Sequence, residues 1–233
     1  MQLPIFFTAQ AAALHESLTL DEDTSRHLSQ VLRMRAGEQL QLADGNGTLL
    51  TAAITDAHKK HSTVKITAVE NVPRNTRRTS IAISLLKNAN RFEWFLEKAT
   101  ELGVQEIIPL ICVRTERQHF RLDRMKSIIT SAMLQSRQAW LTELSSPVQL
   151  DKFLQNARYT QKLVAHCMDD PNKKKLNEAV NASQDAVILI GPEGDFTAEE
   201  VSLALQHEFI PVSLGNTRLR TETAGIVAAS WLA

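Results

Sequence analysis

Apolar and polar positions alternate along the first seventy residues. The run STVKITAVE over residues 62–70 places every second side chain on an apolar face, which is typical of a half-buried strand. QLQLAD (39–44) and TLLTAAIT (48–55) flank a Gly-Asn-Gly turn, and this arrangement predicts two paired strands. Residues 24–38 are expected to form one short helix that ends at Gly37. The pattern predicts a small barrel or sandwich.

A different pattern begins after residue 79, beyond a polar, proline-containing linker at 71–78. SIAISLL (80–86) is a buried run, and apolar residues then recur at helical spacing until Gly103. Further strands are predicted at 104–111, 162–167, 186–190 and 209–215, and further helices at 121–138, 173–182, 197–207 and 221–232. Strands that alternate with helices indicate a parallel α/β sheet covered on both faces.

The composition fits a globular protein, and the charge is unevenly distributed. Of the 233 residues, 43% are hydrophobic and 22% are charged, which is enough to build a core. The net charge is zero, but residues 79–139 carry nine basic residues against six acidic ones, whereas residues 186–233 carry two against six. A polyanion is therefore expected to meet residues 1–139, although a solvated surface would give the same counts.

The first residues and the cysteines favour a reducing cytoplasmic setting. The first residues lack a basic segment followed by a long apolar run, so no signal peptide is expected, and no run is long enough to cross a bilayer. Cys112 and Cys167 lie far apart in sequence. Neither a disulfide nor a metal cluster is expected from them.

Three predicted strands end in residues that could bind a ligand. His166 follows Lys-Leu-Val-Ala, Gly-Pro-Glu-Gly follows the strand at 186–190, and Gly215 follows Pro-Val-Ser-Leu. In open α/β sheets, ligands bind at the carboxyl ends of strands. A glycine there can also serve only the turn. The loops lack the dinucleotide and P-loop patterns, so neither chemistry is supported. A compact cofactor with an adenine and a cationic centre suits a site with many backbone groups and carboxylates nearby.

Two segments at the end of the chain resemble the signature of a known family. LIGPEGDFTAEEV and VSLGNTRLRTETA are similar to the C-terminal motifs of the SPOUT superfamily of S-adenosylmethionine-dependent RNA methyltransferases. RHLSQVLRMRAGEQLQLADGNG and KNANRFEWFLEKATELGVQEIIPL extend the likeness along nearly the whole chain. More narrowly, the chain resembles the ribosomal RNA small subunit methyltransferase E family, which methylates N3 of a uridine in small-subunit (16S) RNA.

The resemblance implies a fold and a cellular context. It implies a PUA-like β-barrel over residues 1–72 that binds RNA, and a trefoil-knotted SPOUT methyltransferase domain over residues 73–233. It also implies a cytoplasmic homodimer that acts on 16S ribosomal RNA, within the small ribosomal subunit or as naked RNA, without metal or membrane. Two alternatives stay open: a SPOUT enzyme that acts on transfer RNA, and an inactive RNA-binding relative.

The resemblance also implies the roles of individual residues. The residues expected to bind S-adenosylmethionine are His166, Ile190, Gly191, Pro192, Glu193, Gly194, Leu214, Gly215, Leu219, Arg220, Thr221, Thr223 and Ala224. Because the N3 proton must leave, Arg220 is expected to stabilise the uridine anion, with Glu222 or Glu193 as the base or as the group that orients Arg220. Glu222 could instead cap a helix, and Glu193 could be a surface charge. The residues expected to contact RNA are Arg26, His27, Arg33, Arg35, Lys87, Arg91, Lys98, Arg114, Arg117 and Arg137.

The chain departs from the family pattern at several positions. Asp195 stands where relatives usually carry a second glycine, so the pocket is expected to be more acidic or its loop less free. Ile5 stands where many relatives have an arginine, and the residues around Arg137 differ from the usual motif. Each departure bears on a predicted contact with cofactor or RNA.

Overall fold

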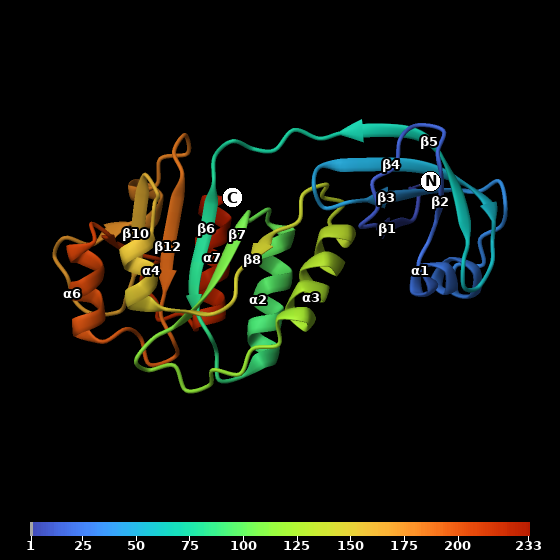
Figure 1. Ribbon diagram of the computed structural model, residues 1–233. Helices are drawn as coiled ribbons and strands as arrows, with labels where there is room; N and C mark the ends of the chain where they lie inside the picture. The colour runs from blue at the N-terminus through green and yellow to red at the C-terminus, as the bar shows by residue number, and fades with distance from the viewer. Residues whose placement is uncertain (1) are drawn as a thin grey trace. The chain divides into compact units, whose positions relative to one another are not determined.

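The computed structural model describes residues 2–233, and the chain divides into two compact units. The first unit contains the chain up to Arg74 together with Met133–Leu141. The second contains Asn75–Ala132 and Thr142–Ala233. Figure 1 labels most of the helices and strands of both units.

The first unit is built on a five-stranded sheet with the strand order β1-β3-β4-β5-β2. Its strands are β1 (Ile5–Phe7), β2 (Ser17–Thr19), β3 (Gln39–Ala43), β4 (Thr48–Asp56) and β5 (Thr63–Asn71). β1 pairs with β3 in parallel, and the other neighbours are antiparallel. The strands predicted from the alternating pattern are confirmed, because Leu40, Leu42, Val64 and Ile66 are fully buried. The alternation in the run at 62–70 ends early, since Ala68 is exposed.

The helix predicted over residues 24–38 is shorter than expected. The structure has α1 (Glu22–Arg26), capped by the carboxylate of Asp21, followed by a π-helical turn, η1 (His27–Val31). Arg33 then takes a left-handed conformation with φ of 55°, which ends the helix before Gly37. Gly37 instead serves the turn into β3, where its N–H donates to the carbonyl of Ile54.

The segment Met133–Leu141 is fastened to the first unit by specific contacts. Arg137 donates one hydrogen bond to the carbonyl of Leu3 at 2.8 Å and another to the side chain of Gln41 at 3.1 Å. The indole of Trp140 covers Gly47, where a Cβ would lie only 2.4 Å from the ring. A larger residue at position 47 would therefore displace the indole.

The second unit contains an eight-stranded sheet whose described pairs are all parallel. Its strands are β6 (Thr79–Ser84), β7 (Glu106–Ile111), β8 (Glu143–Leu144), β9 (Val148–Gln149), β10 (Gln161–Ala165), β11 (Lys174–Lys175), β12 (Ala186–Ile190) and β13 (Ile210–Ser213). The order is β11-β13-β10-β12-β6-β7-β8, with β9 also paired to β7. The predicted parallel α/β architecture is confirmed.

Helices cover both faces of this sheet. The second unit contains α2 (Ala89–Glu101), α4 (Leu150–Asn156), α5 (Leu176–Ala179), α6 (Ala198–Gln206) and α7 (Thr221–Leu232). It also contains most of α3 (Leu122–Gln135), whose last residues belong to the first unit. Leu154 of α4 and Val201 of α6 join one core cluster with Val187 and Leu189 of β12. On the opposite face α7 packs so closely that a Cβ on Gly225 would lie 2.6 Å from the ring of Phe95 in α2. Because both faces are covered, β6 and β12 are buried along their whole length.

Two helix boundaries of the second unit follow the signals in the sequence, whereas the helix predicted over 173–182 is shortened to Leu176–Ala179. Thr197 and Glu200 form the predicted capping box at the start of α6, with each side chain accepting from the other residue's backbone N–H. Gly103 follows α2 with φ of 87°, the left-handed conformation expected of a glycine just after a helix. None of the helices in residues 2–233 has the length and apolar character needed to cross a membrane.

Candidate active site

A cavity lies where three neighbouring strands of the second unit end. β10 lies between β13 and β12, with Ala165 beside both Val212 and Ile190. The strands are parallel, so the loops that follow them leave the sheet at the same end. Together with residues from α2 and α7, these loops enclose a cavity of about 790 Å³. This volume is sufficient for a nucleoside-sized ligand.

The cavity contains most of the residues predicted to bind the cofactor. All of them except Gly194 and Thr223 line it, and Arg91, which was predicted to contact RNA, lines it as well. The remaining lining residues were not in the predicted set: Ala165, Cys167, Asp169, Lys173, Asp195, Val212, Ser213, Asn216, Thr217 and Arg218. Most of these flank the three strand ends, which is the signal that could have identified them.

The two glycines of the Gly-Pro-Glu-Gly loop have different surroundings. A Cβ on Gly191 would lie 3.1 Å from both the backbone nitrogen and the ring of Phe196. A Cβ on Gly194 would meet only the flexible side chain of Arg114, at 3.2 Å. Gly191 is therefore the position where a side chain would disturb the cavity wall, whereas Gly194 lies outside the lining.

Arg114 and Lys87 hold the same loop from segments that follow β7 and β6. Arg114 donates to the carbonyl of Gly194 at 2.6 Å. The backbone N–H of Lys87 donates to Glu193 at 3.0 Å. The loop is thus fixed before any ligand binds, which lowers the entropy lost on binding.

His166 is a deeply buried polar side chain of the cavity. Its side chain is 1% exposed, and within residues 2–233 neither ring nitrogen has a hydrogen-bond partner. Burial, followed by the positive charge of Lys173, lowers the pKa of His166, so the imidazole is neutral at pH 7. Lys173 is held close by, donating to the carbonyls of His166 and Met168. The carboxylate of Asp170 lies 3.9 Å from Nε2, and both ring nitrogens are shielded within the wall of the cavity.

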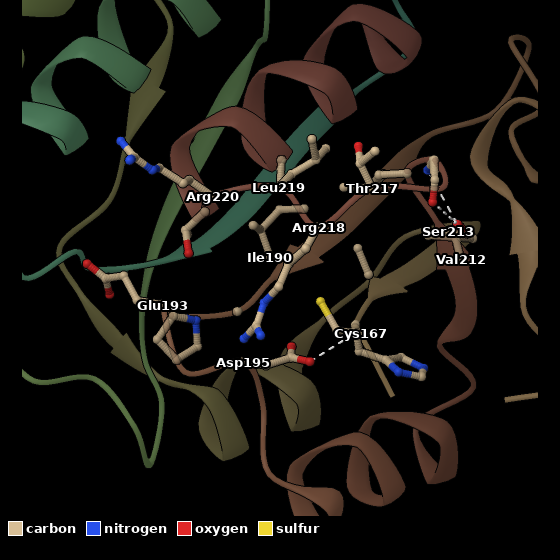
Figure 2. A pocket seen from close by; sticks show the side chains of 18 of the residues that line it. Cys167, Ile190, Glu193, Asp195, Val212, Ser213, Thr217, Arg218, Leu219 and Arg220 are labelled. Carbon is tan, nitrogen blue, oxygen red and sulfur yellow. Dashed lines mark hydrogen bonds between the residues drawn. The ribbon is translucent and has the colours of Figure 1, made fainter. Parts of the chain in front are cut away.

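The three predicted catalytic residues occupy different positions. Arg220 precedes α7, is exposed and lines the cavity, and Glu193 lies at the same end of the cavity (Figure 2). Glu222 is buried outside the lining, with its Oε1 3.6 Å from Arg91 Nε and its Oε2 without a partner among the described residues. The structure therefore pairs Glu222 with Arg91 and not with Arg220.

Most of the predicted RNA-binding residues already contact other groups of the protein. Lys98 pairs with Glu97 and Glu101, Lys87 pairs with Glu116, and Arg26 pairs with Asp23. Arg91, Arg114 and Arg137 bind other parts of the protein, and His27 packs against the ring of Phe6. Among the described residues, the side chains of Arg33, Arg35 and Arg117 have no partner, so they are the most available to a phosphate.

Comparison with known proteins places the chain in a family. An RNA methyltransferase domain matches residues 73–233, and an RNA methyltransferase PUA domain matches residues 20–67. A protein from Synechocystis named ribosomal RNA small subunit methyltransferase E is 30% identical over 223 residues, covering 92% of this chain and 72% of that protein. The chain belongs to the ribosomal RNA small subunit methyltransferase E family. The resemblance inferred from the motifs is confirmed.

Solved structures agree with the family assignment over the whole chain. A putative methyltransferase from Legionella pneumophila, solved with bound SAM, is 33% identical, has a TM-score of 0.89, and is matched over 100% of this chain and 97% of that one. A ribosomal RNA small subunit methyltransferase E from Neisseria gonorrhoeae, bound to S-adenosyl methionine, is 28% identical with a TM-score of 0.88 over 98% and 96% of the chains. The predicted α/β fold with a PUA-like β-domain, and the prediction of an RNA methyltransferase, are therefore confirmed.

Proposed function

We propose that this methyltransferase transfers a methyl group from S-adenosylmethionine to N3 of a uridine in 16S ribosomal RNA. The observation that carries the proposal is the cavity at the carboxyl ends of β10, β12 and β13, which gathers the family's motif residues in one place. Membership of the small subunit methyltransferase E family supports the RNA substrate, and relatives solved with SAM support the cofactor.

The cavity suits S-adenosylmethionine in size and in chemistry. Its apolar wall (Ile190, Val212, Leu214 and Leu219) can pack against adenine. A Cβ on Gly191 would press on Phe196, so a side chain there would displace the loop that lines the cavity. When bound, S-adenosylmethionine supplies an electrophilic methyl group, and the protein has to orient it toward the base.

Arg220 is the proposed cation beside the uridine. N3 of uridine carries a proton that must leave before or during methyl transfer, so negative charge develops on the base. Arg220 is exposed on the cavity wall, and no ion pair occupies it among the described residues, so its guanidinium is available to stabilise that charge. Glu193, fixed by the N–H of Lys87, is the better placed of the two carboxylates to accept the proton.

We propose further that the enzyme works in the cytoplasm as a homodimer with a trefoil-knotted second domain and without a metal ion. The loops that follow β12 and β13 are the segments expected to form the knot, and they border the same cavity. The sequence has only two cysteines, which supports a reducing compartment. The substrate is proposed to be RNA within the small ribosomal subunit.

Methyl transfer by the purified protein tests this proposal. The protein is incubated with methyl-labelled S-adenosylmethionine and either small-subunit RNA, small subunits or transfer RNA, and the product is digested to nucleosides. Label in 3-methyluridine from the small-subunit substrates supports the proposal. Label confined to transfer RNA, or in a 2′-O-methylated nucleoside, would assign a different reaction. Cofactor binding without any transfer would indicate an inactive relative.

A further inference from the structure

Asp195 adopts an unusual backbone conformation on the wall of the cavity. Its φ is 63°, in the left-handed region that most residues with a side chain avoid. Aspartate is one of the few residues that tolerate this conformation, because its short carboxylate can bond to nearby backbone groups. The residue therefore fits a position that demands either glycine or such a side chain.

The carboxylate of Asp195 joins two segments that follow different strands. Oδ2 accepts a hydrogen bond from the N–H of Cys167, just after β10, at 2.7 Å. Oδ1 accepts from the N–H of Phe196, just before the start of α6, at 2.9 Å. Hydrogen bonds to an ionised carboxylate are stronger than bonds between neutral groups. This one side chain thus ties the loop after β12 to the end of β10.

The groups around Asp195 face the cavity as well. In Figure 2 the guanidinium of Arg218 points toward the carboxylate, and the thiol of Cys167 lies beside both. Burial, followed by the negative charge of Asp195, raises the pKa of Cys167, while Arg218 and Lys173 act in the opposite direction. Asp195 therefore influences both the shape of this part of the cavity and its charge.

We infer that Asp195 is a positioning residue for the cofactor, because its carboxylate fixes the distance between the loop after β12 and the loop after β10. Both loops line the cavity in which the ligand would bind. The inference rests on the proposed function, since it assumes that S-adenosylmethionine occupies this cavity. Without the carboxylate, Lys87 and Arg114 still hold the loop after β12, but the bond to Cys167 is lost, so ligand binding has to fix the distance between the two loops.

Two substitutions distinguish the effect of the two Asp195 hydrogen bonds from the effect of its left-handed backbone conformation. Asp195→Gly tolerates the left-handed backbone but removes both hydrogen bonds, and Asp195→Asn has nearly the same shape but only one accepting oxygen. We expect the dissociation constant for S-adenosylmethionine to rise about tenfold or more in Asp195→Gly and less in Asp195→Asn, measured by calorimetry. Glu199→Gln, which removes a charge from α6 outside the cavity, is the matched control and should bind as the wild type does.

Alkylation of Cys167 gives a second readout that reports on local charge. The only other cysteine, Cys112, is buried, so iodoacetamide at pH 8 reports on Cys167. Both Asp195 variants should react faster than the wild type, since they lack the negative charge that disfavours the thiolate. Glu199→Gln should react at the wild-type rate, and S-adenosylmethionine should protect the wild type.

The outcomes distinguish this inference from the proposed function. If the wild type fails to bind S-adenosylmethionine, the proposed function is wrong. If the wild type binds it and Asp195→Gly, folded by its thermal transition, binds equally tightly, Asp195 does not position the cofactor. Unchanged alkylation of Cys167 in a folded Asp195→Asn would equally contradict the inference, because the carboxylate would then not act on the end of β10.

Discussion

Arg220 combines exposure, a place on the cavity wall and a guanidinium that no ion pair occupies among residues 2–233. If it stabilises the developing uridine anion, Arg220→Ala should lower the single-turnover rate of methylation by about 10²-fold, the loss typical of removing one preorganised donor. Arg220→Lys should restore only part of the rate, because a point charge replaces a planar set of donors. A higher pH should partly rescue Arg220→Ala, since more uridine ionises without help.

The control for Arg220 separates chemistry from binding. The rate is measured at saturating RNA and cofactor, and cofactor affinity is measured separately for each variant. Equal single-turnover rates for the wild type and Arg220→Ala would remove Arg220 from the mechanism. Another cation of the cavity, such as Arg218 or Arg91, would then have to stabilise the negative charge on the uridine.

At the residue scale, the sequence predicted those site residues that follow directly from strand ends. His166, Gly191 and Gly215 could be placed because each comes after a buried strand, and parallel strands bring such residues together. Lys173 and Arg218 could not be placed, because they enter the cavity only through loop conformations that apolar spacing does not encode. The left-handed backbone of Asp195 explains how an aspartate can stand where the family pattern leads one to expect glycine.

At the scale of elements, the end of the sheet opposite the cavity is held by Glu106 of β7. It accepts hydrogen bonds from Ser80 at 2.5 Å, Tyr159 at 2.6 Å and Arg78 at 2.6 Å. These groups come from β6 and from the segments before β6 and β10. Burial alone would raise the pKa of Glu106, but the three hydrogen bonds and the charge of Arg78 outweigh it and lower the pKa below its usual value of 4.5.

Glu106→Gln should destabilise the second unit by about 2 kcal/mol at pH 7, because charge-assisted bonds become neutral ones. Since the folded pKa is depressed, this stabilisation is fully present above pH 4.5 and is lost as the pH falls through the folded pKa. Urea unfolding at pH 7 and at about pH 3 would therefore show a difference between the wild type and Glu106→Gln that shrinks in acid. A difference that stays constant between the two pH values would mean that the ionised carboxylate contributes nothing.

Elements with a clear period or a capping signal were predicted well. The capping box at Thr197 and the helix over 221–232 occur where the sequence placed them. The prediction of a helix over residues 24–38 was wrong at its end. The apolar spacing continues past Arg33, but the left-handed conformation of that residue ends the helix. Backbone conformations of this kind depend on tertiary packing, which local spacing does not reveal.

At the scale of the whole molecule, the return of Met133–Leu141 to the first unit could not be predicted. The contacts that hold it, such as Arg137 with Leu3 and Trp140 with Gly47, join residues far apart in sequence. Neither the spacing of apolar residues nor the distribution of charge along the sequence predicts such pairs. Arg137, expected to contact RNA, donates hydrogen bonds within the first unit, so an RNA role for it stays a prediction.

RNA binding should depend most on arginines that have no partner among the described residues. Replacing Arg33 and Arg35 with glutamine should weaken binding to small-subunit RNA and flatten its salt dependence, by about one unit of slope for each phosphate that the protein no longer neutralises. Lys98→Gln is the matched control, because Lys98 is already paired with Glu97 and Glu101 and should change the slope much less. Equal slopes for the double variant and the wild type would make Arg33 and Arg35 ordinary surface residues.

The proposed methylation of uridine N3 is tested most directly by the nucleoside content of small-subunit RNA in cells with and without this gene. Purified 16S RNA is digested and analysed by mass spectrometry, and the deletion strain is complemented with the wild type or with Arg220→Ala. We expect 3-methyluridine to disappear on deletion, to return with the wild type, and to return little or not at all with Arg220→Ala. An unchanged level of 3-methyluridine in the deletion strain would contradict the proposed reaction.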